Sequence, residues 1–141
     1  MTPPVRQSGV LAVSDDRICL VTARSGRRWV IPKGQIDPGH TAGEAALVEA
    51  WEEAGLVGAL DPAPVGSYVY EKLGRAHHVL VYRMTVTAVH DRYPEMTVRQ
   101  REWLTADEVI DRVDEPELRE LLRHVFPTGV IGETNPTALG E

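Results

Sequence analysis

The chain has 141 residues, of which 43% are hydrophobic and 26% charged, with a formal net charge of −6 and a single cysteine, Cys19. This length suits one domain with its own core, the lone cysteine excludes a disulfide within the chain, and the negative charge argues against a stable nucleic-acid partner. Residues 1–16 lack the charged head and apolar run of a secretion signal, and no apolar stretch approaches the roughly 20 residues that cross a bilayer, so we expect a cytoplasmic protein with no membrane segment.

Strand patterns fill the first third of the chain. Apolar, β-branched runs at Ser8–Val13 and Ile18–Ala23 flank a polar turn and predict a β-hairpin. Trp29–Ile31 predicts a short strand that ends at a proline, and residues 34–41 have the turn chemistry of a loop. The segment therefore predicts three strands followed by a loop.

One helix is expected directly after this loop. Thr41 can cap its first turn while Glu44, three residues later, reaches back, which is the pattern of a capping box. The helix should end near Ala54, because Gly55 suits the left-handed position that follows a helix. Its apolar residues are expected to pack against a sheet: Leu47, Ala50, Trp51 and Ala54.

The second half of the chain predicts strands and then helices. Two strands are expected, at Val65–Tyr70 and His78–Val86. A capping box opens a helix over residues 105–113, and Pro116–Val125 predicts a last helix. We expect one domain over residues 1–126 and a mobile tail over residues 127–141, which lack periodicity. The order of elements predicts an α+β fold with a mixed central sheet between helices.

Three glutamates, Glu49, Glu52 and Glu53, share one face of the predicted helix because they are three and four residues apart. Like charges at this spacing destabilise a helix by roughly 0.2–0.5 kcal/mol per pair. One interpretation is an ordinary solvated surface. The other is a site for a hard divalent cation, since Mg²⁺ prefers carboxylates, water and substrate phosphate. No Lys or Arg is interleaved with the glutamates, and this lack of positive charge favours the cation site.

Charge is distributed unevenly along the chain. Residues 1–33 contain six basic and two acidic side chains, whereas residues 34–71 contain seven acidic and no Lys or Arg side chains. A site for a metal and a polyanion needs both kinds of block. Guanidinium and ammonium groups bind phosphate oxygens, so the first block supplies candidate phosphate contacts. These are Arg24, Arg27, Arg28 and Lys33, of which we expect two only to solvate a hairpin.

Residues 32–56 resemble the Nudix box, G-x5-E-x7-R-E-U-x-E-E-x-G-U, in which U is aliphatic. The positions that match in register are Gly34, Glu49, Ala50, Glu52, Glu53, Gly55 and Leu56. His40 stands where the first glutamate is expected, and Val48 stands where the family has an arginine that steadies the glutamates by an ion pair. Residues 27–34 and 93–103 are similar to segments of hydrolases of diphosphoinositol polyphosphates and diadenosine polyphosphates.

This resemblance implies an α/β/α sandwich and a Mg²⁺-dependent hydrolase, with Mn²⁺ as a substitute, that cuts a phosphoanhydride bond in a small polyphosphate. It implies that one of Glu49, Glu52 and Glu53 activates water while the others hold the metal, and we take Glu49 as the base. His40 is a candidate acid or substrate contact, with an ordinary loop histidine as the alternative.

Three functions stay open. The first is hydrolysis of dinucleoside polyphosphates or diphosphoinositol polyphosphates. The second is hydrolysis of another nucleoside diphosphate derivative, such as a nucleotide sugar or a noncanonical nucleoside triphosphate. The third is a degenerate domain that binds nucleotides as a sensor without cutting them. His40 and Val48 keep the third open, while retention of all three glutamates argues against it.

Overall fold

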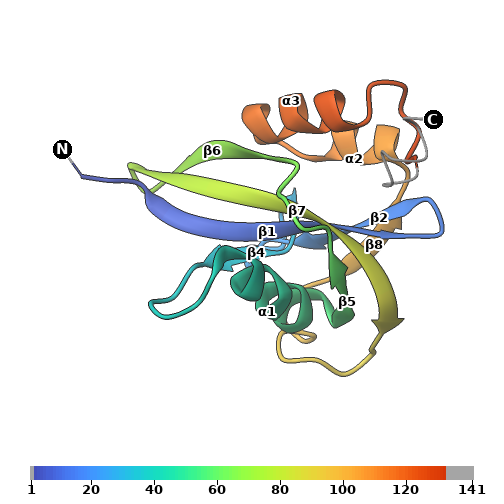
Figure 1. Cartoon of the computed structure of the whole chain (residues 1–141), viewed down its shortest axis with the longest axis horizontal. Helices are drawn as coiled ribbons and strands as arrows, with labels where there is room; N and C mark the ends of the chain where they lie inside the picture. Colours follow the sequence, from blue (N-terminus) through green and yellow to red (C-terminus); the bar gives the residue numbers. More distant parts are fainter. Residues whose placement is uncertain (1, 133–141) are drawn as a thin grey trace.

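A computed structural model describes residues 2–132 (Figure 1). Within this range the chain forms one sheet and three helices. The strands are β1 (Val5–Ser14), β2 (Arg17–Thr22), β3 (Trp29–Val30), β4 (Lys33–Gln35), β5 (Leu56–Leu60), β6 (Gly66–Lys72), β7 (Arg75–Val89) and β8 (Arg101–Leu104). The helices are α1 (Ala42–Ala54), α2 (Ala106–Arg112) and α3 (Pro116–Val125).

The sheet is built around a parallel pair, β1 and β7, in which Val5 lies opposite His77 and Val13 opposite Thr85. The other strand pairs are antiparallel, and the main path runs β3-β2-β1-β7-β5. Three strands pair off this path, β4 with β1, β6 with β7 and β8 with β2. The predicted mixed sheet is therefore confirmed.

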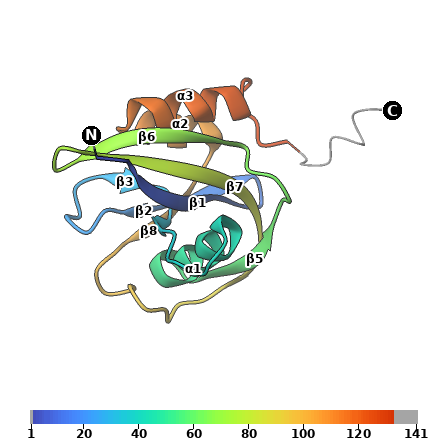
Figure 2. The same ribbon diagram turned by 60° about the vertical axis from the view of Figure 1, so that its left-hand side comes forward.

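Side chains of the central strands alternate between two hydrophobic cores. In β1, Leu11 belongs to the core under α2 and α3, whereas its neighbours Val10 and Ala12 belong to the core under α1. Figures 1 and 2 show α2 and α3 on one face of the sheet and α1 on the other. This is the predicted layering, with the sheet between helices.

Helix α1 begins and ends where the sequence predicts. Both hydrogen bonds of the capping box at Thr41 are present, and Gly55 has the left-handed φ of 69°. The buried face differs from the prediction, however, since Leu47 is 38% exposed. Ala50 and Ala54 face the sheet as predicted, together with Ala46, and each of the three is fully buried. Their small side chains let the helix approach the strands closely, and this leaves Leu47 on the outer side.

Three short strands were not expected from the sequence. Residues 33–35, predicted as the start of a loop, pair with β1 as β4. Strand β5 contains Gly58, where its register with β7 shifts, and a glycine weakens a strand pattern. Strand β8 has only four residues and starts with two charged ones, so it shows little apolar alternation.

The last described residues are attached to the domain. Ile131 is 7% exposed and belongs to the core under α2 and α3. Arg83 donates a hydrogen bond to the carbonyl of Gly132 over 2.6 Å. The first part of the predicted mobile tail is therefore packed, and residues 133–141 lie outside the described part of the chain. Between residues 2 and 132, none of the helices has the length and apolar character needed to cross a bilayer.

Candidate functional site

Among Glu49, Glu52 and Glu53, the most deeply buried is Glu53, with 6% of its surface exposed. Its Oε1 accepts a hydrogen bond from the backbone N–H of Lys33, with an N···O distance of 3.2 Å. Its Oε2 lies 3.2 Å from Nη2 of Arg99. Burial raises the pKa of Glu53, while Arg99 and Lys33 oppose that rise. Glu53 is therefore held in one orientation by β4 and by a side chain from beyond β7.

Glu49 lies one turn before Glu53, against the backbone of β4. A side chain at Gly34 would overlap the Glu49 carboxylate, so the glycine of the motif makes room for it. Burial, together with the negative charges of Glu53 and Glu52, raises the pKa of Glu49 to about 8. Within residues 2–132, neither Glu49 nor the half-buried Glu52 forms an ion pair with a Lys or Arg. The face thus keeps an excess of negative charge.

Arg99 supplies the support that the motif lacks at Val48. Its Nε donates to Glu95 over 2.7 Å and its Nη1 to the carbonyl of Thr22 over 2.8 Å, while its Nη2 contacts Glu53. The side chain is only 10% exposed. A planar guanidinium presents five N–H donors in a rigid fork, which fits acceptors on several sides better than the compact ammonium of a lysine. Arg99 therefore joins α1, β2 and the segment before β8.

The segment between β7 and β8 is fixed against the C-terminal end of α1. The N–H of Glu95 donates to the carbonyl of Glu52 over 2.9 Å. Arg101 donates to the carbonyl of Ala54 over 2.6 Å and to that of His90 over 2.7 Å. Helix α1 has no basic residue in its own last turn, so Arg101 provides the cation that favours a helix C-terminus. The support for the glutamates thus comes from a segment that is itself anchored to their helix.

A cavity of about 220 Å³ opens beside Glu53. The cationic side chains that line it are Arg24, Arg28, Lys33, Lys72 and Arg99. Lys33 lies with Nζ 4.9 Å from the centre of the Tyr70 ring, which also lines the cavity. Burial lowers the pKa of Lys33, while Glu115 and Glu53 oppose this. A cavity with this lining attracts a polyanion of the size of a few phosphate groups.

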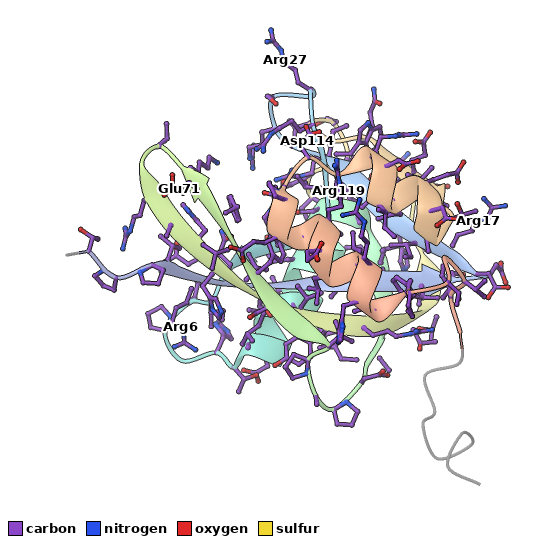
Figure 3. All side chains as sticks on the ribbon, turned by 90° about the horizontal axis from the view of Figure 1, so that it is seen from above. Arg6, Arg17, Arg27, Glu71, Asp114 and Arg119 are labelled. Carbon is purple, nitrogen blue, oxygen red and sulfur yellow. The ribbon has the colours of Figure 1, made fainter. Side chains whose placement is uncertain are left out.

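The structure brings together three of the five predicted substrate contacts. Arg24, Arg28 and Lys33 line the basic cavity. Arg27 does not line it and instead stands at the tip of the loop between β2 and β3, pointing away from the domain (Figure 3). His40 is exposed and does not line the cavity. It adds a small part to the lowering of the pKa of Glu44, in the first turn of α1, which is caused mainly by hydrogen bonding to the backbone of Thr41.

Lys72, Tyr70 and Arg99 line the cavity but were not predicted as substrate contacts. Lys72 and Tyr70 belong to β6, which reaches the cavity only through its pairing with β7. Arg99 lies in a segment whose resemblance to known hydrolases was visible, although its contact with Glu53 was not. Alternation along β6 was the signal available, because it places residues 70 and 72 on the same face.

The chemistry of the α1 face fits a divalent cation. Glu49, Glu52 and Glu53 provide oxygen donors on adjacent turns, and two of them lack a cationic partner among the described residues. Residues 2–132 contain no group of three or more acidic, histidine or cysteine side chains that are already placed to hold a metal ion. The side chains of these glutamates would therefore have to change rotamer for all three to bind one metal ion.

Comparison with known proteins agrees with this geometry. The sequence profile of the NUDIX domain matches residues 3–127. Nudix hydrolase 4 of Arabidopsis thaliana is 32% identical over 108 residues, which are 75% of this chain and 52% of that protein. Diphosphoinositol polyphosphate phosphohydrolase 2 of Mus musculus is 32% identical over 99 residues, which are 68% of this chain and 54% of that protein. The chain thus spans about half the length of these relatives.

A crystal structure of the Ap4A hydrolase of C. elegans shares the fold. It superposes with a TM-score of 0.68 at 22% identity, covering 86% of this chain and 95% of that one. The resemblance inferred from residues 32–56 is therefore confirmed by both sequence and fold. On these grounds the chain belongs to the Nudix family.

Proposed function

We propose that this chain is a hydrolase that requires Mg²⁺, or Mn²⁺ in its place, and cleaves a phosphoanhydride bond in a nucleotide-linked or inositol-linked polyphosphate. The observation that carries the proposal is that a positively charged cavity adjoins a negatively charged helix face. A cavity lined by five cationic side chains adjoins the face of α1 that carries three glutamates. Family membership supports the reaction class, and the names of the relatives supply the candidate substrates.

The basic cavity would bind the phosphate groups. Arg24 and Arg28 are exposed and can turn their guanidinium forks toward phosphate oxygens. Lys33 presents a compact charge from β4, next to the glutamates. These contacts would hold the substrate with one bridging oxygen near α1, and would offset the charge that develops on the leaving phosphate.

Glu49, Glu52 and Glu53 would hold the metal ion, which would neutralise phosphate oxygens and lower the barrier to attack. Glu49 would accept a proton from the attacking water as its oxygen bonds to phosphorus. The bridging P–O bond would break, and its electron pair would leave with the departing phosphate. Glu53 would keep the orientation set by Arg99 and Lys33, and Glu49 and Glu52 would turn toward the ion beside it.

A substrate panel tests this proposal. Purified protein would be incubated with Mg²⁺ and with diadenosine tetraphosphate, a diphosphoinositol polyphosphate, a nucleotide sugar and nucleoside triphosphates, and the products resolved by chromatography. Release of phosphate-containing fragments from at least one compound is expected. Nucleotide binding without turnover across the whole panel would favour the non-catalytic sensor. We also propose that the protein is cytoplasmic and that its binding partner is a small polyphosphate substrate.

A further inference from the structure

Gln7 lines the basic cavity beside the cationic side chains, although it carries no charge itself. It lies in β1, where it pairs with Gln35 of β4 on one side and with Val79 of β7 on the other. Its backbone is therefore fixed within the sheet. What Gln7 can offer a ligand depends on which end of its amide faces the cavity, since the amide oxygen accepts hydrogen bonds and the amide nitrogen donates them.

The oxygen of this amide is already occupied. The hydroxyl of Tyr70, in β6, donates a hydrogen bond to Oε1 of Gln7 over 2.7 Å, and this bond spans β7, which lies between the two strands. Burial, together with the negative charge of Glu115, raises the pKa of Tyr70 to about 12, so the hydroxyl keeps its proton at neutral pH and remains a donor. Because Oε1 accepts this bond, Nε2 is the end of the amide that is left for a ligand.

Tyr70 is itself held in place by two contacts. Its ring stacks on that of His77, its partner in β7, with 4.8 Å between the ring centres and 23° between the ring planes. Nζ of Lys33 lies 4.9 Å from the centre of the same ring. The ring is thus covered by its neighbours, so the part of Tyr70 in the cavity is to hold Gln7 and not to receive a ligand.

The Nε2 atom of Gln7 makes no hydrogen bond to any residue between 2 and 132. Gln7 is half-buried, and its Nε2 is not one of the enclosed side-chain atoms that lack a partner, so it stays accessible to a ligand. It offers two N–H donors in a cavity whose cations attract phosphate, and phosphate oxygens are strong acceptors. These donors are oriented in advance, which lowers the entropy lost on binding.

We propose that Gln7 is a phosphate-binding residue of the basic cavity, which donates from Nε2 to a phosphate oxygen, and that the Tyr70 hydroxyl holds it in this orientation. The inference rests on the proposed function only for the assignment of this cavity to phosphate groups. It adds a neutral, directional contact to the cationic ones. A cation attracts phosphate from several directions, whereas the amide favours ligands that place an oxygen within hydrogen-bond reach of one point.

Binding of inorganic triphosphate without a divalent metal separates this inference from hydrolysis. Gln7→Met nearly keeps the length of the side chain and removes both donors. The dissociation constant, measured by calorimetry, should rise roughly tenfold, the scale of one hydrogen bond to a charged acceptor. The matched control is Gln35→Met, at the exposed residue of β4 that lies opposite Gln7 and does not line the cavity. It should keep the wild-type affinity.

A double-mutant cycle tests the role of Tyr70. Tyr70→Phe keeps the ring but frees Oε1 of Gln7, so the amide can turn, and affinity should fall by about threefold, the scale of one neutral hydrogen bond. In the Gln7→Met background the same change should have no measurable effect, because the hydroxyl acts through Gln7. The full loss in that background would show that the hydroxyl contacts the ligand directly, and would overturn the proposed arrangement.

Unchanged affinity in Gln7→Met would overturn the proposal, as would an equal loss in Gln35→Met or a wild type that binds no triphosphate. Should Gln7→Met fail to fold, as judged by circular dichroism, nuclear magnetic resonance of the wild type decides. The side-chain amide signals of Gln7 should shift on titration with triphosphate while those of Gln35 stay in place, and a Gln7 signal that does not move would refute the contact. Absence of hydrolysis in the substrate panel would refute the proposed function without affecting this result.

Discussion

The guanidinium group of Arg99 lies with Nη2 3.2 Å from Oε2 of Glu53, and both side chains are at least nine-tenths buried. The motif places an arginine within the helix, at the position that Val48 occupies here. In this chain the cation reaches the glutamate from a segment 46 residues further along. The supporting ion pair is therefore present although the motif position that normally provides it is not.

Removal of Arg99 should lower the stability of the fold. Arg99→Ala leaves Glu53 buried without its cation, and breaking such a pair costs about 3–5 kcal/mol in the free energy of unfolding. Chemical denaturation measures this. The double variant Arg99→Ala with Glu53→Gln should lose less than the sum of the single losses, because the neutral amide no longer needs a cation. Arg123→Ala, which breaks the exposed pair with Glu120, should cost under about 1 kcal/mol. Additive losses at Arg99 and Glu53 would contradict the coupling.

An arginine at position 48, as in the motif, should recover part of the activity that is lost when Arg99 is replaced by lysine. Val48 is 44% exposed, so an arginine fits there without displacing core residues, and it lies four residues before Glu52. Arg99→Lys keeps a charge but loses the planar fork, and we expect kcat/KM to fall by roughly tenfold, about 1.4 kcal/mol in the transition state. Adding Val48→Arg should recover part of this loss, whereas Val48→Arg alone should have little effect. The four proteins form a cycle on kcat/KM, and strict additivity would show that the two arginines do not replace each other.

Metal removal should abolish turnover. The α1 face carries an excess of negative charge, so excess chelator should stop hydrolysis and added Mg²⁺ or Mn²⁺ should restore it. Glu53→Gln should lower kcat by at least ~10²-fold, the scale of losing one fixed electrostatic contact. Glu120→Gln, on the exposed side of α3, is the control and should keep full activity. Turnover that persists in chelator would refute the metal requirement.

The buried thiol of Cys19 should resist modification and should make the fold sensitive to alkali. Burial raises its pKa from 9.0 to about 12, so the native thiol stays protonated at pH 8. Disulfide reagents should react slowly with native protein and rapidly in denaturant. The unfolded thiol loses its proton near pH 9 while the folded thiol keeps it, so the stability from this group is complete below pH 9 and is lost as the pH rises toward 12. Cys19→Ala should shift alkaline unfolding to higher pH, and an unchanged midpoint would exclude this cause.

Local signals in the sequence were sufficient for α1 and its glutamates. The capping box at Thr41 and the glycine at position 55 fix both ends of the helix, and the spacing of the glutamates follows from the helical period. The site beyond α1 depends on strand pairing, which carries no comparable local signal. Lys72 and Tyr70 reach the basic cavity only because β6 folds back along β7.

The sheet lies between α1 and α3. Helix α1 packs on one face of the sheet, whereas α2 and α3 pack on the other (Figure 2). Lys33 is close to both sides, since the negative charges of Glu53 on α1 and of Glu115 before α3 both act to raise its pKa. Because each face has its own hydrophobic core, substitutions in the core under α2 and α3 should leave the packing of α1, and with it the positions of its carboxylates, unchanged.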